Sequence, residues 1–264
     1  MSNTPTHCSE RFACTIGSFK LPHFVELQIR SIRHVFGDRT PILVSDDWSD
    51  QSAQIRDLCA KYEVAHLCSE SPRGHFAGDV ASIINSIAFA SYTGSQLALK
   101  LSQRMVLAQP VCREILSHHL ASPTLDIALP ARISSHSIHR HESRFFSRFP
   151  VLSDLILIRS GSITPEEFKE IYEAKCNNRR SHLDGFVEPL MFELIEKRFP
   201  NRYVLMPEFS HHYPGREKLF LRRCQSVDGD YALLADKLGL PITHWSTLEW
   251  RELSASYRPV PRFI

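Results

Sequence analysis

The feature that most constrains the fold is an alternation of short apolar runs with longer amphipathic segments in the N-terminal part of the chain. Three runs have the length and composition of strands, namely Phe12–Thr15, Pro41–Ser45 and Tyr62–Cys68. Between them lie two helical patterns, of which the first opens at Pro22 and is closed by Gly37. This strand–helix–strand order is typical of a parallel sheet with crossover helices, so the sequence predicts an α/β fold.

The rest of the chain continues this pattern but contains more loops. A loop is expected over Ser69–Gly78, followed by a helix over Asp79–Tyr92 and a strand over Gln96–Leu101. A later helix has a strong start, because Thr164 can act as its cap and Glu167 stands three residues on. The remaining expected elements are strands at Ile127–Leu129, Asp154–Ile158 and Tyr203–Met206, and helices at Val111–Leu120, Thr164–Asn177, Val187–Phe199 and Tyr231–Leu238.

Composition limits the partners and the compartment. The chain is 43% apolar and 23% charged, as globular proteins are, and its 31 Lys and Arg nearly balance 29 Asp and Glu, which argues against nucleic acid as a partner. No apolar stretch approaches the ~18 to 20 residues of a membrane helix. The polar start and seven cysteines without a CxxC pair predict reduced thiols and a cytoplasmic location. With neither a repeat nor a clear boundary, we expect one domain over residues 1–264 with a loop-rich C-terminal half.

Polar residues stand where the predicted parallel strands end. Thr15, Asp46 and Arg104 occupy such positions, and ligands of open α/β sheets bind beyond the carboxyl ends of the strands. A carboxylate there can accept the imide proton of a uracil-like base or bind a ribose hydroxyl. The alternative is that Asp46, Asp47 and Ser49 form a turn and cap the next helix.

Three segments in a fixed order carry a resemblance. They are Asp46-Asp47-Trp48-Ser49-Asp50, the glycine- and asparagine-containing segment Gly78–Ile87, and the strand end Leu101-Ser102-Gln103-Arg104. Over Phe12–Val106 the chain resembles nucleotide-sugar-dependent glycosyltransferases of the GT-A type, nearest to family 2 and the bacterial surface-polysaccharide enzymes.

The resemblance implies a single Rossmann-like GT-A domain with a mostly parallel central sheet flanked by helices. Residues 1–106 would bind the nucleotide and residues 107–264 the acceptor. The implied activity is transfer of a sugar from a nucleotide-sugar donor to a saccharide or lipid-linked acceptor, for capsule or lipopolysaccharide, with no cofactor. The mildly basic second half would suit peripheral contact with the inner face of a membrane.

The sequence departs from this family where the family carries its metal-binding DxD motif. Ser102-Gln103-Arg104 stands there, and serine and glutamine are poor ligands for divalent cations. We therefore expect no metal, and Arg104 with Lys100 to hold the leaving diphosphate. The alternative places Lys100 and Arg104 on the solvated flank of an edge strand.

An inverting transfer needs a base that takes a proton from the acceptor hydroxyl. The family has an acidic motif at the start of a helix in its second half, and Asp184 and Glu188 resemble it. The alternative role for both is to cap that helix, where its dipole favours a carboxylate.

The last candidates lie in a late loop. His211, His212 and Arg216 could close over the bound donor, as late loops of such enzymes commonly do. Two other functions compete with sugar transfer. One is a degenerate, non-catalytic protein that binds a nucleotide or a partner on the same scaffold, and the other is a metal-dependent hydrolase that uses Asp46, Asp47 and Glu188.

Overall fold

The structure is a computed structural model that describes residues 11–103, 105–131, 151–177, 187–210, 218–222 and 228–240. Its strands are β1 (Phe12–Ser18), β2 (Ile42–Asp46), β3 (Ala65–Cys68), β4 (Leu97–Ser102), β5 (Met105–Leu107), β6 (Ile127–Pro130), β7 (Leu155–Arg159), β8 (Tyr203–Met206) and β9 (Phe220–Arg222). Its helices are α1 (Pro22–Phe36), α2 (Ser52–Lys61), α3 (Gly74–Tyr92), α4 (Val111–His119), α6 (Pro165–Asn177), α7 (Val187–Arg198) and α8 (Asp228–Lys237), with a 3-10 turn, η2 (Pro207–Phe209).

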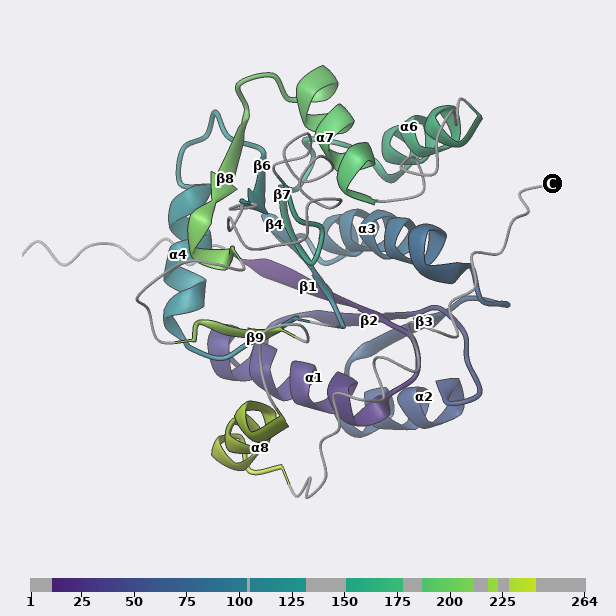
Figure 1. Cartoon of the computed structure of the whole chain (residues 1–264), viewed down its shortest axis with the longest axis vertical. Helices are drawn as coiled ribbons and strands as arrows, with labels where there is room; N and C mark the ends of the chain where they lie inside the picture. Colours follow the sequence, from purple (N-terminus) through teal and green to yellow (C-terminus); the bar gives the residue numbers. More distant parts are fainter. Residues whose placement is uncertain are drawn as a thin grey trace, which may run out of the picture.

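Seven strands form one sheet in the order β3-β2-β1-β4-β7-β6-β8, and β5 pairs with β9 beside it. Strands β1 to β4 are parallel, as are β6 and β8, whereas β7 is antiparallel to both of its neighbours. Figure 1 shows α1 and α2 on one face of this sheet and α3, α6 and α7 on the other. The predicted mostly parallel α/β sheet flanked by helices is confirmed.

The two faces of the central strands differ in character. Alternate residues of a strand point to opposite faces. In β1, Phe12, Cys14 and Ile16 belong to the core under α1, α2 and α4. The opposite face of the same strand carries Thr15 and Gly17, and α3 packs closely there: a Cβ on Gly17 would lie 2.8 Å from the Ser82 Oγ of that helix.

Two expectations about element boundaries are wrong, and one strand pairing was not predicted. Strand β1 runs on to Ser18, so Thr15 lies inside the strand and not at its end. The segment expected as a loop up to Gly78 is helical from Gly74 onward. The pairing of β5 with β9 was not expected at all, because both strands are three residues long and lie more than a hundred residues apart in the sequence.

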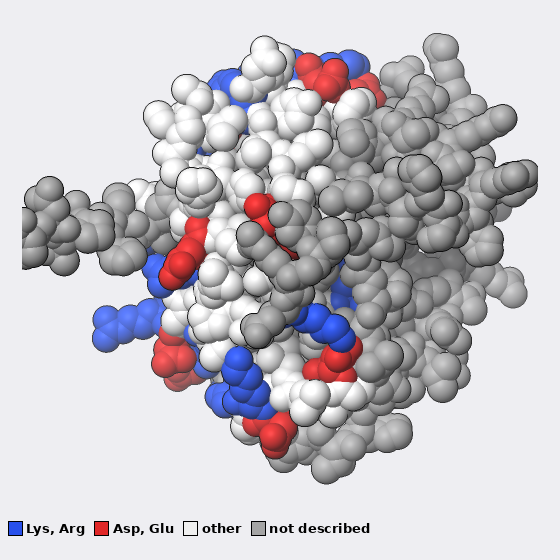
Figure 2. All heavy atoms as spheres, turned by 60° about the vertical axis from the view of Figure 1, so that its left-hand side comes forward, with Lys and Arg blue, Asp and Glu red and all other residues white. Residues whose placement is uncertain are grey.

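Charges of both signs are mixed on one face of the molecule. On the side of the molecule that Figure 2 shows, Lys and Arg side chains lie beside Asp and Glu side chains. Among the described helices, none has the length and apolar content needed to cross a membrane.

Candidate functional site

The candidate site lies at the carboxyl ends of the four parallel strands, β1 to β4, and this side of the sheet is called the carboxyl edge below. Register pairs Ser18 with Asp46, Asp46 with Cys68, and Gly17 with Ser102, so these terminal residues are neighbours across the sheet. Ligands of open α/β sheets bind outside this edge. The side chains there divide into a group around β2 and β3 and a group around β4, β7 and α7.

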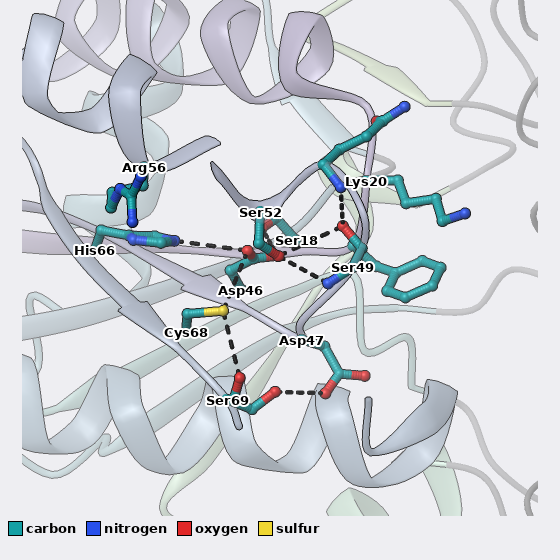
Figure 3. A network of polar contacts seen from close by, with 12 residues as sticks. Ser18, Lys20, Asp46, Asp47, Ser49, Ser52, Arg56, His66, Cys68 and Ser69 are labelled. Carbon is teal, nitrogen blue, oxygen red and sulfur yellow. Dashed lines mark hydrogen bonds and ion pairs between the residues drawn. The ribbon is translucent and has the colours of Figure 1, made fainter. Parts of the chain in front are cut away.

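Asp46 ends β2 with its side chain fully covered. Its Oδ1 accepts a hydrogen bond from Ser18 Oγ at 3.2 Å. Its Oδ2 lies 3.6 Å from Cys68 Sγ and 3.6 Å from His66 Nε2, both on β3 (Figure 3). The carboxylate is thus turned toward β1 and β3, and its expected contact with a nucleoside stays a prediction.

Asp47, the next residue, points to the opposite face of the sheet and caps α3. Its two carboxylate oxygens accept the backbone N–H groups of Arg73 at 2.9 Å and Gly74 at 3.1 Å, and Ser69 Oγ lies 3.4 Å away. Burial raises the pKa of Asp47 to about 6, although these hydrogen bonds act in the other direction. The capping alternative describes Asp47 well, but the capped helix is α3 and not the next helix along the chain.

Gly78 fits directly beside this cap. A Cβ at that position would lie 2.7 Å from Asp47 Oδ2. The glycine therefore lets the first turns of α3 approach the carboxylate that caps the helix, a packing reason for a residue that the sequence alone suggested as part of a loop.

Lys100 is buried in the middle of the sheet and faces α3. Its Nζ donates to Asp79 Oδ1 at 2.6 Å and to the Ser153 carbonyl oxygen at 3.1 Å. The alternative that places Lys100 on the solvated flank of an edge strand is wrong, because β4 lies between β1 and β7 and the Lys100 side chain is buried. Thr15 is its register partner on β1, fully buried, and its Oγ1 has no hydrogen-bond partner among the described residues.

Glu188 is connected to Lys100 through one residue. Ser153 Oγ donates to Glu188 Oε1 at 3.1 Å, while the carbonyl oxygen of Ser153 accepts from Lys100. Glu188 is the second residue of α7 and is partly exposed. The N-terminal end of a helix favours the ionised form of such a carboxylate. The structure therefore brings this candidate base to the same sheet edge as the end of β4.

An acidic residue that the sequence analysis missed, Asp154, directly precedes β7 and lies beside the end of β4. Ser102 Oγ donates to Asp154 Oδ1 at 2.9 Å, and Asp154 forms an ion pair with Arg222 of β9. Only the antiparallel pairing of β7 with β4, in which Leu155 faces Leu101, places Asp154 at this edge. The one signal in the sequence was an aspartate directly before the apolar run of β7.

Gln103 holds the backbone that follows β1. Its Nε2 donates to the Lys20 carbonyl oxygen at 2.7 Å, and its Oε1 accepts from the Phe19 N–H at 3.3 Å. The side-chain amide of Gln103 therefore contacts the loop that follows β1.

Five further predicted site residues lie outside the described part of the chain, namely Arg104, Asp184, His211, His212 and Arg216.

Comparison with known proteins shows the fold. No protein-family model and no curated protein sequence matches the chain. Among solved structures it is similar to glucosyl-3-phosphoglycerate synthase from Mycobacterium tuberculosis in complex with Mn²⁺, UDP-glucose and phosphoglyceric acid, with a TM-score of 0.51, 9% identity and coverage of 89% of this chain and 82% of that one.

Two further structures are slightly less similar. A glycosyltransferase involved in the glycosylation of the major capsid of PBCV-1 has a TM-score of 0.49 and 11% identity, with coverage of 87% of this chain and 98% of that one. A cytidylyltransferase from Leptospira borgpetersenii has a TM-score of 0.48 and 10% identity, with coverage of 96% and 99%. The similarity to the synthase, at 9% identity, supports the expected GT-A-type α/β fold and leaves the chemistry to the residues of the site.

Proposed function

We propose that this chain transfers a sugar from a nucleotide-sugar donor to an acceptor hydroxyl. One observation carries the proposal: a partly exposed carboxylate, Glu188, lies at the carboxyl edge of a GT-A-type sheet and is linked through Ser153 to the buried Lys100 of β4. One solved structure of similar fold is a synthase in complex with Mn²⁺, UDP-glucose and phosphoglyceric acid. Fold likeness alone does not decide function, so the proposal depends on this edge.

The reaction needs one base and one stabilised leaving group. In an inverting transfer, the acceptor oxygen attacks the anomeric carbon, its proton passes to the base, and the bond to the nucleoside diphosphate breaks. Glu188 and Asp184 are the proposed bases. In the described structure Glu188 Oε1 accepts a hydrogen bond from a neutral hydroxyl, Ser153 Oγ. The ionised carboxylate of a glutamate is itself a proton acceptor, as a base must be.

We further propose that the leaving diphosphate is held by basic side chains and not by a metal at the end of β4. Support comes from Ser102 and Gln103, whose side chains contact Asp154 and the backbone after β1. Lys100 is committed to Asp79, so Arg104 is the stronger candidate of the two, with His211, His212 and Arg216 as candidates in the later loop. Guanidinium groups suit this role because they bind phosphate oxygens in pairs.

The acceptor is proposed as a saccharide or a lipid-linked saccharide, in the assembly of a surface polysaccharide. Residues 107–264 would supply its binding half, since they include α7 and Glu188. Peripheral contact with a membrane is compatible with a lipid-linked acceptor and belongs to the same proposal.

A panel of nucleotides tests donor binding. The thermal midpoint of the chain is measured with UDP, GDP, CDP, CMP and dTDP, each with Mn²⁺ and again with EDTA. A nucleotide at one hundred times its dissociation constant stabilises the fold by about 2.7 kcal/mol, which moves the midpoint by several degrees. We expect one nucleotide to act in both conditions. A response to none of them would contradict nucleotide binding, and a response only with Mn²⁺ would contradict metal independence.

One observation favours a second function, a non-catalytic nucleotide- or partner-binding protein. The carboxylates of Asp46 and Asp47 both accept hydrogen bonds from the protein itself: Asp46 from β1, and Asp47 from the start of α3. Such structural roles are what a scaffold that has lost its catalytic activity would retain. Such a protein would give the same thermal shift but no sugar transfer. The metal-dependent hydrolase finds no support here, since Asp46 and Asp47 point to opposite faces of the sheet and do not converge on one ion.

A further inference from the structure

Three side chains with different donor atoms meet where β2 and β3 end. Asp46 is the last residue of β2, and the register places Cys68 directly beside it. His66 precedes Cys68 by two residues on β3 and therefore lies on the same face. The carboxylate oxygen, the imidazole nitrogen and the thiol sulfur all lie within 4.8 Å of one another. Figure 3 shows the three side chains gathered at the ends of the two strands.

The spacing of these atoms is close to that of a tetrahedral zinc site. Zinc bonds of about 2.0 to 2.3 Å to oxygen, nitrogen and sulfur place neighbouring ligand atoms about 3.4 to 3.6 Å apart. Asp46 Oδ2 lies 3.6 Å from Cys68 Sγ and 3.6 Å from His66 Nε2. Small rotations of the His66 and Cys68 side chains would complete the triangle without any change in strand register.

The hydrogen bonding of His66 and Asp46 also favours a bound cation in this cluster. His66 Nε2 is buried and makes no hydrogen bond among the described residues. Asp46 is a fully covered carboxylate whose described hydrogen bonds come from the Ser18 hydroxyl and the Cys68 thiol. Buried carboxylates are normally compensated by a cation or by several donors, and buried imidazole nitrogens normally have a partner. A single bound cation would satisfy both groups at once.

We propose that Asp46, His66 and Cys68 bind one divalent transition-metal ion, with zinc as the best match to this donor set. Oxygen, nitrogen and sulfur donors together suit zinc, while magnesium and calcium prefer oxygen alone. Binding replaces the thiol proton of Cys68 by the metal and releases that proton to solvent. Three protein ligands leave a fourth position for water.

This site differs from the one that the family resemblance concerns. The family's metal motif follows the strand that corresponds to β4, whereas Asp46 and Cys68 end β2 and β3 on the side of the sheet covered by α2. An ion here would fasten the end of the edge strand β3 to β2. Asp46 would then be a metal ligand, so the nucleoside contact expected of it would have to be made by other groups.

Cobalt substitution gives a direct test. The chain of residues 1–264, without a histidine tag, is reduced, freed of metal and titrated with Co²⁺. We expect one equivalent to produce a thiolate-to-cobalt charge-transfer band with the intense visible bands of a four-coordinate ion, and Zn²⁺ to abolish both. Absence of the charge-transfer band would overturn the proposal.

Matched variants assign the ligands. Cys68→Ser should remove the charge-transfer band, and His66→Gln should weaken cobalt binding at least tenfold. Cys112→Ser changes a buried thiol of α4, His34→Gln changes an exposed histidine of α1, and both should bind as the parent does. Equal binding by Cys68→Ser and Cys112→Ser would contradict the assignment.

A second measurement needs no variant and covers the case in which Cys68→Ser does not fold. The parent chain is alkylated with iodoacetamide, with and without zinc, and the modified peptides are identified by mass spectrometry. We expect Cys68, which is partly exposed, to be labelled at least tenfold more slowly with zinc, while the buried Cys59 stays unlabelled in both samples. An unchanged rate at Cys68 would refute the site. Neither experiment contains a nucleotide, so failure here leaves the proposed sugar transfer untouched.

Discussion

The two groups of side chains at the carboxyl ends of the parallel strands differ in how their buried charges are compensated. Around β2 and β3, Asp46 and Asp47 take their described hydrogen bonds from two hydroxyls, a thiol and backbone N–H groups. Around β4 and β7, acidic and basic side chains form ion pairs, namely Lys100–Asp79 and Asp154–Arg222. The first group is compensated by dipoles and weak donors, and the second by opposite charges.

This difference separates two kinds of role. The carboxylates of the first group fix local structure, since Asp47 holds the start of α3 and Asp46 joins three strands. The second group places a charged network under a partly exposed carboxylate, Glu188, through Ser153. We therefore assign chemistry to the second group and architecture, with the inferred metal site, to the first.

The largest expected effect is on the second group. Lys100→Met removes the buried cation of this pair and leaves Asp79, whose side chain is 15% exposed, without it. Loss of one partner of a buried pair costs about 3 to 5 kcal/mol in the free energy of unfolding. Urea denaturation measures it. Lys61→Met, which removes an exposed partner of Glu26, is the matched control and should cost less than about 1 kcal/mol. Similar small losses in both variants would contradict a structural role for the Lys100 pair.

A smaller effect is expected at the capped helix. Gly78→Ala introduces a Cβ that collides with Asp47, so we expect a loss of about 1 to 3 kcal/mol in the free energy of unfolding. Glycine-to-alanine changes inside helices normally stabilise by up to about 1 kcal/mol. Gly229→Ala in α8, where a Cβ would meet nothing within 4 Å, should show this ordinary gain. If Gly78→Ala stabilises too, the close approach to the Asp47 cap is wrong.

The smallest effect concerns the titration of Asp47. Its pKa of about 6 lies above the ordinary value of 3.8, so between these pH values the unfolded chain releases a proton that the folded chain keeps. The contribution of Asp47 to stability is therefore full below pH 3.8 and is lost as the pH rises to about 6. Allowing for solvent screening, the change is about 1 to 2 kcal/mol.

Asp47→Asn isolates this titration, because asparagine does not ionise. The free energy of unfolding of both chains is measured by urea denaturation across this pH range. We expect the advantage of the parent chain over the variant to shrink as the pH rises. An advantage that is constant, or that grows with pH, would contradict a raised pKa of Asp47 in the folded chain.

Local signals in the sequence were sufficient where the partners are close along the chain. Thr164 and Glu167 form the expected reciprocal cap of α6, with the Thr164 N–H donating to Glu167 Oε2 at 2.9 Å and the Glu167 N–H donating to Thr164 Oγ1 at 3.1 Å. The order of strands and helices up to β4 was predictable for the same reason, because each turn and helix start lies beside the run that it ends.

Contacts between distant segments were not predictable in this way. Helix α3 starts earlier than the sequence predicts. Its cap, Asp47, lies 26 and 27 residues before the backbone N–H groups whose hydrogen bonds it accepts, so no signal beside the helix start indicates it. The ion pair of Asp154 with Arg222 depends on the pairing of β4 with β7 and of β5 with β9. The partner of Lys100 lies on a helix that precedes its strand.

Sugar transfer itself is tested most directly by following the donor. The chain of residues 1–264 is incubated with UDP-, GDP-, CMP- and dTDP-sugars in the presence of EDTA, together with mixed saccharide acceptors. Release of the nucleotide and formation of the glycoside are measured. Glu188→Gln is compared with Glu193→Gln, a change on the same helix at a residue paired with Lys197. We predict turnover of one donor, lowered about 10²- to 10⁴-fold by Glu188→Gln alone. Equal turnover by the two variants would contradict the role of Glu188, and absence of turnover with every donor, despite a nucleotide-induced thermal shift, would make the chain a binding protein.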